Sequence, residues 1–168
     1  MKIRLALPED VDIISRLETQ LYPNPWLPAT FRSLLKQDRA RILVAEDLEA
    51  GVVGYAIFWW VMEQAELGNL AVAREFQGRG VGSLLLDRVL ADAVAEHVKG
   101  VFLEVRESNE PALRLYRSRG FSQISIRRDY YRNPREDALI LMKPITPPRD
   151  VEPSDTDEGK GPSGRTGV

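Results

Sequence analysis

The stretch Phe76-Gln77-Gly78-Arg79-Gly80-Val81-Gly82 decides the fold of this chain. The residues before it, 67–72, predict a strand, and the apolar residues after it recur at helical spacing. Three glycines spaced two apart let the backbone approach a ligand closely and turn its N–H groups inward. Because a helix N-terminus adds unpaired donors and a favourable dipole for an anion, the stretch predicts a cradle for a diphosphate.

Two common phosphate-binding motifs do not fit this glycine-rich stretch. A P-loop requires G-x-x-x-x-G-K-[ST], and no lysine or hydroxyl residue stands in the right place. A Rossmann fingerprint requires G-x-G-x-x-G, whereas the spacing here is G-x-G-x-G. An ordinary glycine-rich turn before a helix stays open as an alternative, because so short a motif also occurs by chance.

Composition limits the classes of function. The 168 residues suit one domain, and the net charge of −2 gives no general attraction to nucleic acid or to a membrane. The absence of cysteine excludes disulfides and a cysteine nucleophile, and the single histidine argues against a histidine metal site. Because there is no apolar run of ~20 residues and no visible signal peptide, we expect a cytoplasmic protein without a metal.

Hydrophobic periodicity predicts strands and helices along most of the chain. Strands are expected at residues 2–7, 41–45, 52–61, 63–72, 101–105, 121–127 and 137–145. Helices are expected after Pro8, around Phe31, after Gly82 and from Ser108 to Gly120. The middle strands predict an antiparallel meander, and the apolar strand 101–105 predicts burial on both faces. Residues 127–134 are expected to form a polar loop.

The composition changes after Ile145. Residues 146–168 hold four prolines, four glycines and no aromatic residue. Such a segment has too little apolar surface to offset the entropy of ordering. We therefore expect a domain over residues 1–145 and a disordered tail over residues 146–168.

Three residues suggest chemistry but also have simpler interpretations. Glu104 lies within the apolar strand 101–105, where a carboxylate must be paired, hydrogen-bonded or used. A salt bridge to an arginine such as Arg106 is the alternative to a functional role. Tyr22 and Trp26 lie on a proline-rich segment, and they either pack against the core or line a substrate groove.

Several blocks in the same order resemble those of one family. They are Pro25-Trp26, Gln77-x-x-Gly80-x-Gly82, the run from Leu103 to Phe121, Ile126-Arg127-Arg128-x-Tyr130-Tyr131 and Arg135-Glu136-Asp137-Ala138. Together they resemble the RimI-type ribosomal-protein alanine N-acetyltransferases of the GNAT superfamily, over residues 1–145. The resemblance implies an α/β fold with a mixed, mostly antiparallel sheet of about seven strands flanked by helices. It also implies a splayed gap between the fourth and fifth strands, where acetyl-CoA lies.

The resemblance implies roles for individual residues. The expected cofactor-binding residues are Leu70, Ala71, Val72, Gln77, Gly78, Arg79, Gly80, Val81, Gly82, Ser83 and Asn109. Of these, 70–72 would hold the pantetheine arm and 78–83 the pyrophosphate. Glu104 would act as the general base, and Tyr116, two helical turns after Asn109, would protonate the leaving thiolate. Packing in the core is the alternative for Tyr116.

The implied substrate is a protein N-terminus, namely the N-terminal alanine of a small-subunit ribosomal protein. The expected groove residues are Tyr22, Trp26, Tyr130 and Tyr131, since tyrosine and tryptophan combine apolar area with a polar group. Glu63 and Glu66 could attract a basic substrate or serve as the base instead. Acetylation of a lysine side chain or a small amine, or acyl-CoA binding without turnover, are the alternatives. We expect a monomer or weak dimer with no nucleic-acid or membrane partner.

Overall fold

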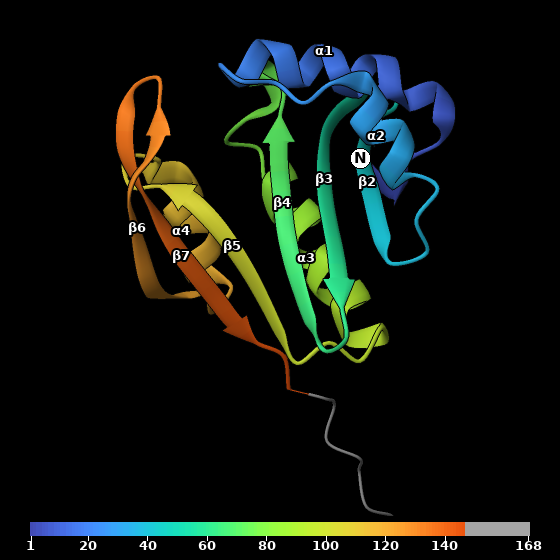
Figure 1. Ribbon diagram of the computed structural model, residues 1–168. Helices are drawn as coiled ribbons and strands as arrows, with labels where there is room; N and C mark the ends of the chain where they lie inside the picture. The colour runs from blue at the N-terminus through green and yellow to red at the C-terminus, as the bar shows by residue number, and fades with distance from the viewer. Residues whose placement is uncertain (147–168) are drawn as a thin grey trace, which may run out of the picture.

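The computed structural model describes residues 1–146 and shows a twisted sheet with helices on both faces (Figure 1). The strands of this part are β1 Lys2–Leu5, β2 Ala40–Asp47, β3 Gly51–Val61, β4 Gln64–Val72, β5 Gly100–Arg106, β6 Ser122–Arg132 and β7 Arg135–Pro144. The α-helices are α1 Val11–Leu21, α2 Pro28–Leu34, α3 Val81–Ala95 and α4 Glu110–Ser118. Short 3-10 turns, Pro8–Asp10 and Arg74–Phe76, precede α1 and the glycine-rich stretch.

The alternation of apolar residues along the strands produces two hydrophobic clusters, one on each face of the sheet. Ile42 and Val44 of β2 point toward α1 and α2, while Leu43 and Ala45 point toward α3. The cluster on the α1 and α2 side also contains Phe31 of α2, and the cluster on the α3 side extends to α4. Because both faces are covered, β2 and β3 are almost continuously apolar rather than half polar.

The sheet order within residues 1–146 is β1-β2-β3-β4-β5-β7-β6, and β4–β5 is the parallel pair among five antiparallel ones. The pairing of β4 with β5 covers Gln64–Leu67 against Gly100–Leu103 and then stops. Beyond that point the two strands diverge toward α1, as the green and yellow strands of Figure 1 show. The prediction of a mixed, mostly antiparallel sheet with a splayed fourth and fifth strand is therefore confirmed.

A β-bulge lies in β4 beside this split. Ile57 of β3 pairs with Asn69, and the next residue, Phe58, pairs with Leu67, so Gly68 is the extra residue. In a regular strand Leu67 and Asn69 would share a face, but here Leu67 joins the cluster under α3 while Asn69 reaches α1. A Cβ at Gly68 would overlap the Trp59 ring and approach the Trp26 ring to 3.2 Å. Only glycine therefore fits this bulge.

Two predictions about the second half of the chain are wrong. Residues 127–134, predicted as a polar loop, belong to the β6–β7 hairpin, whose turn is Asn133–Pro134. β6 is an edge strand exposed along almost its whole length, so its polar composition resembles that of a loop. The strand 101–105 is buried on one face only, since Phe102, Glu104 and Arg106 are all partly exposed.

The predicted tail lies outside the described residues from position 147 onward. Within residues 1–146, no helix has both the length and the apolar character needed to cross a membrane.

Candidate active site

The split between β4 and β5 opens into two adjoining cavities. The glycine-loop cavity, about 440 Å³, lies between the end of β4, the start of α3 and α4. The carboxylate cavity, about 350 Å³, lies between α1, β4, β5 and β6 and contains Glu66 and Glu104. The residues that line both are Tyr22, Leu70, Asn109, Ala112 and Tyr116. A long ligand could therefore pass from one cavity into the other beside Tyr116.

The glycine-loop cavity is shaped by the start of α3. Gly78 and Gly80 have φ of +73° and +82°, and a Cβ at either position would meet no atom within 4 Å. Gly80 is the N-cap of α3 and offers no side-chain cap, so N–H groups of the first turn remain available to an anion. The amide of Gln77 donates to the carbonyl of Val72 at 2.9 Å and fixes the loop to β4.

The structure brings together nearly all the predicted cofactor residues. Those that line the glycine-loop cavity are Leu70, Ala71, Val72, Gln77, Gly78, Gly80, Val81, Gly82, Ser83 and Asn109. Arg79 is not among the lining residues, and its guanidinium lies 5.2 Å from the centroid of the Phe76 ring. Asn109 has a second role as the N-cap of α4, where its side chain accepts a hydrogen bond from the N–H of Ala112.

Glu104 is the residue of β5 directly after the last pairing with β4. Its side chain is 24% exposed and lines the carboxylate cavity. The alternative of a salt bridge to an arginine is correct in kind but not in partner, because Glu104 pairs with Arg127 of β6 at 2.9 Å and not with Arg106. Arg106 instead pairs with Glu136 at 3.4 Å. Arg127 reaches this position from β6, where it pairs with Ala138 of β7.

Aromatic side chains form two walls of the carboxylate cavity. On one side, the phenol of Tyr22 donates to the carbonyl of Leu70 at 3.0 Å, and the Trp26 ring packs 6.3 Å from that of Trp59. On the other side, Tyr130 and Tyr131 of β6 pack edge to face at 5.0 Å. Tyr22 and Trp26 thus pack against the core and line the cavity at once, so the two interpretations of these residues do not exclude each other.

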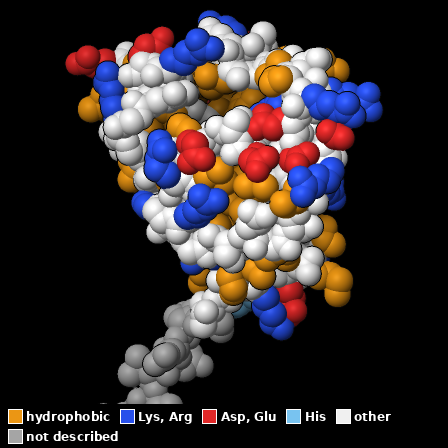
Figure 2. All heavy atoms as spheres, turned by 90° about the vertical axis from the view of Figure 1, so that its left-hand side faces the viewer, with side chains coloured by type: hydrophobic (Ala, Val, Ile, Leu, Met, Phe, Trp, Pro, Cys, Tyr) orange, Lys and Arg blue, Asp and Glu red, His pale blue; other side chains and the backbone are white. Residues whose placement is uncertain are grey.

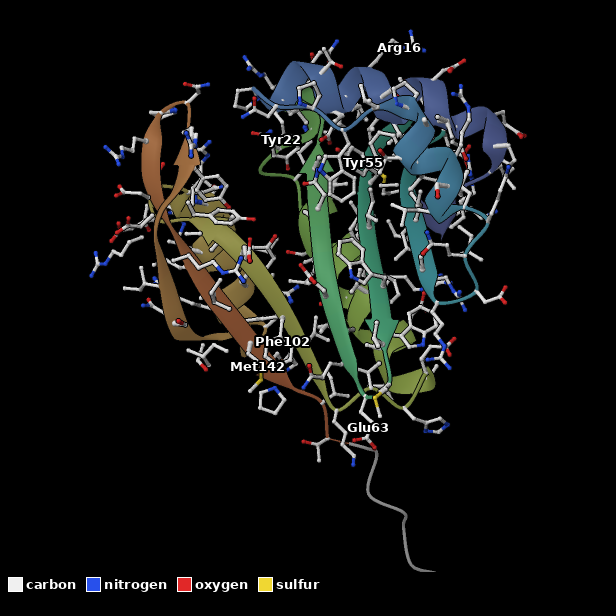
Figure 3. All side chains as sticks on the ribbon, viewed as in Figure 1. Arg16, Tyr22, Tyr55, Glu63, Phe102 and Met142 are labelled. Carbon is white, nitrogen blue, oxygen red and sulfur yellow. The ribbon has the colours of Figure 1, made fainter. Side chains whose placement is uncertain are left out.

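Glu63, in the turn before β4, and Glu66, within β4, lie in different places. Glu63 pairs with Lys99 at 2.8 Å, at the end of the sheet opposite Tyr22, as Figure 3 shows. Because Glu63 does not line the carboxylate cavity, the structure does not support Glu63 as the alternative base. Glu66 lines the carboxylate cavity and has no ion-pair partner among the described residues. Its partial burial, together with the charge of Glu104, raises the pKa of the Glu66 carboxyl.

Tyr116 lies where the two cavities join. It is 7% exposed, and its ring packs edge to face against Phe121 at 5.7 Å. Burial raises the pKa of the Tyr116 phenol, so the group is protonated at neutral pH. Burial and the charge of Glu104 likewise raise the pKa of Tyr131 to about 12. Tyr116 therefore packs in the hydrophobic core and also lines both cavities.

Glu18, Tyr55 and Asn69 form a buried polar network that was not predicted from the sequence. The Glu18 carboxylate is 1% exposed and accepts hydrogen bonds from the Tyr55 phenol, from the Asn69 amide at 2.8 Å and from the Trp26 backbone N–H at 3.0 Å. Glu18 and Asn69 both line the carboxylate cavity. A signal for Glu18 exists, because it falls on the apolar stripe of α1 with Val11, Ile14 and Leu21.

Acidic and basic side chains gather over the outer face near β6. Figure 2 shows acidic groups in the middle of this face, beside apolar surface and flanked by Lys and Arg. Three ion pairs account for part of this pattern: Arg127–Glu104, Arg106–Glu136 and Arg128–Asp137. Among the residues that the structure describes, no group of three His, Cys, Asp or Glu side chains could hold a metal ion.

The joined cavities suit a long thioester whose phosphates would lie at the start of α3. Its acyl group would then lie near Tyr116, in the cavity that contains Glu104. This is the arrangement of an N-acetyltransferase. The model of the "Acetyltransferase (GNAT) family" matches residues 11–121, and the chain belongs to this family.

Individual relatives share most of the chain. It is 34% identical over 140 residues to the [ribosomal protein bS18]-alanine N-acetyltransferase of Escherichia coli K12, covering 82% of this chain and 93% of that protein. The Salmonella typhimurium protein of the same name is 35% identical over 140 residues, with the same coverage. The crystal structure of the Escherichia coli enzyme superposes with a TM-score of 0.79 at 31% identity, over 90% of this chain and 97% of that one.

Proposed function

We propose that this protein transfers the acetyl group of acetyl-CoA to the α-amine of a protein N-terminus, namely the N-terminal alanine of a small-subunit ribosomal protein. The observation that carries the proposal is that Glu104 and Tyr116 line one cavity, at the point where an aromatic groove meets the glycine loop. The names of the Escherichia coli and Salmonella relatives, which specify the alanine of bS18, support this substrate.

The residues of the glycine-loop cavity fit acetyl-CoA. The open space before Gly78 and Gly80 admits phosphate oxygens, and the uncapped start of α3 provides N–H donors. The backbone of Leu70, Ala71 and Val72 provides groups for an extended arm, since the pairing of β4 with β5 has ended before these residues. When bound, acetyl-CoA supplies an activated acetyl thioester.

Two side chains of this protein move the protons that the reaction requires. An α-amine has a pKa of ~8, so most of it is protonated at neutral pH and a base must accept a proton. Glu104 is that base, because it lies in the cavity beside the split. Tyr116 donates its phenolic proton to the leaving sulfur, since it lines both cavities where they join and a phenol is protonated at neutral pH.

The substrate groove suits an extended peptide. The peptide backbone would lie between Tyr22 and Trp26 on one side and the tyrosines of β6 on the other. The Trp26 and Trp59 rings pack against Gly68 in the wall of this groove. A small amine would not need two aromatic walls. A lysine side chain is the second candidate, and it differs in having a longer approach to Glu104.

A peptide panel tests the substrate class. Peptides that begin with Ala, Ser, Gly, Met or Leu are compared with an N-blocked peptide that carries one lysine, and release of the CoA thiol is measured. We expect the alanine peptide to be acetylated fastest and the blocked lysine peptide to react slowest. Faster reaction of the blocked lysine peptide would make the protein a lysine acetyltransferase, and no thiol release with any peptide would refute peptide acetylation.

A further inference from the structure

The Glu18 network contains a buried charge without a cationic partner. The hydrogen-bond partners of the Glu18 carboxylate are a phenol, an amide and a backbone N–H, and no described arginine or lysine pairs with it. A carboxylate this deeply buried persists only when its surroundings supply hydrogen bonds. The network therefore keeps a carboxylate within the wall of the carboxylate cavity.

The network fixes which way the Asn69 amide points. A carboxylate only accepts hydrogen bonds, so the NH₂ group of Asn69 must face Glu18, at 2.8 Å. The same nitrogen also lies 3.2 Å from the Tyr55 oxygen. The amide oxygen of Asn69 is thus turned away from both partners.

This oxygen is open to the carboxylate cavity. No described group donates a hydrogen bond to the amide oxygen of Asn69. If this oxygen were buried, it would be a buried polar atom without a partner, but within residues 1–146 the one such side-chain atom is Oγ of Ser15. Since Asn69 is partly exposed and lines the cavity, its oxygen must be accessible there. The bulge at Gly68 is what turns Asn69 toward this face. The cavity therefore contains an oriented acceptor beside Leu70, across the split from Glu104.

We propose that the amide oxygen of Asn69 accepts a hydrogen bond from the α-ammonium group of the peptide, and that Glu18 is a positioning residue which holds Asn69 in the required orientation. The inference rests on the proposed function and adds the group that recognises the amine. An ammonium has three donors, and Asn69 takes one while another remains for Glu104 or for a water between them. The buried charge of Glu18 further favours a cation at this place.

Binding of two peptides in the presence of CoA tests the contact without turnover. One peptide begins with alanine, and the other begins with a propionyl group, which is alanine without its amine. In Asn69→Ala we expect the alanine peptide to bind about 10- to 100-fold more weakly, the range for a lost hydrogen bond to a charged group. The propionyl peptide and CoA itself should bind within about twofold of wild type. Equal weakening of both peptides, or of neither, would overturn the contact.

A double-mutant cycle tests the positioning role of Glu18. Glu18→Gln can turn an NH₂ group toward Asn69 and so reverse the Asn69 amide. We expect it to weaken the alanine peptide in wild type by about tenfold, yet to have little effect in the Asn69→Ala background. Equal effects in both backgrounds would show that Glu18 does not act through Asn69. Glu63→Gln, at the far end of the sheet, is the matched control.

The outcomes separate this inference from the proposed function. If wild type releases no thiol with any α-amino peptide, both fail. If wild type acetylates the alanine peptide while Asn69→Ala binds it normally, only the inference fails. Melting temperature and CoA affinity report whether each variant is folded, and should Glu18→Gln not fold, the Asn69→Ala comparison decides on its own.

Discussion

Glu104 and Tyr116 reach the junction of the two cavities from different elements, β5 and α4. The residue type alone does not single them out, since the chain holds many acids and five tyrosines. Their positions in the sequence distinguish them, because Glu104 interrupts an apolar strand and Tyr116 occurs in a block shared with the family. The exposed environment of Glu104 and its pairing with Arg127 depend on a hairpin that forms far along the chain.

Substitution of the two residues should separate chemistry from binding. We expect Glu104→Gln to lower kcat with the alanine peptide by about 10²- to 10⁴-fold, the usual range for general-base catalysis. Tyr116→Phe should lower kcat as well, since it removes the phenolic hydroxyl and keeps the ring. Steady-state kinetics on both variants, with acetyl-CoA affinity measured in parallel, check this. Glu63→Gln is the control and should behave as wild type.

Full activity of Glu104→Gln between pH 6 and pH 9 would contradict its assignment as base. Glu66 would then be the alternative, because it lines the same cavity and its carboxyl already has a raised pKa.

The contact between Glu18 and Asn69 could not be predicted from the sequence, for a physical reason. Their meeting depends on the bulge at Gly68, and a bulge changes which face a residue points to without changing the residues on either side.

The start of α3 is the element on which cofactor binding depends. We expect acetyl-CoA to raise the melting temperature of wild type, since a ligand at a hundredfold excess over Kd adds ~2.7 kcal/mol of stability. Gly80→Asp should remove that shift, because a carboxylate before the helix start repels the pyrophosphate. Gly51→Asp is the matched control, since Gly51 also has a positive φ (+74°) with open space around it but lies at the β2–β3 turn.

The melting comparison distinguishes a cradle from an ordinary turn. Aspartate tolerates a left-handed backbone better than most residues, so both variants should fold. An unchanged shift in Gly80→Asp, or no shift in wild type at millimolar acetyl-CoA, would contradict the role assigned to this loop.

The turn before α1 makes stability depend on pH. Arg4 donates to the buried Asp10 at 2.7 and 3.1 Å, and the Leu7 N–H donates to it at 2.7 Å. These contacts lower the pKa of Asp10 below its ordinary value of 3.8. At a pH between the two pKa values, the folded state therefore binds fewer protons than the unfolded state. The stability that Asp10 contributes is fully present above its unfolded-state pKa and is lost as the pH falls through its lower folded-state pKa.

Asp10→Asn should remove this dependence. At pH 7 we expect the variant to be less stable by about 1–3 kcal/mol, because hydrogen bonds to a charged group are lost. The difference from wild type should shrink as the pH is lowered toward 3. Urea unfolding of both proteins between pH 3 and pH 7 measures it, and a difference independent of pH would show that the Asp10 charge is not responsible.

Over the whole molecule, the order of elements was predictable and the details of the second half were not. Strands β2 to β4 and the four helices follow from periodicity, because burial on the sheet faces sets that periodicity. The strand predicted at residues 121–127 is shorter than β6, because an edge strand buries too few side chains to produce an alternating apolar pattern. The splay of β4 from β5 was expected from the family resemblance alone, since nothing in the residues themselves shows where pairing stops.

One measurement tests the central claim most directly. A single peptide that begins with alanine and carries a lysine further along is incubated with the protein and acetyl-CoA, and tandem mass spectrometry locates the acetyl group. The two amines then compete in one molecule at equal concentration. Acetyl on the alanine nitrogen, before any appears on the lysine, is the predicted result. Acetyl on the lysine nitrogen first would contradict the account.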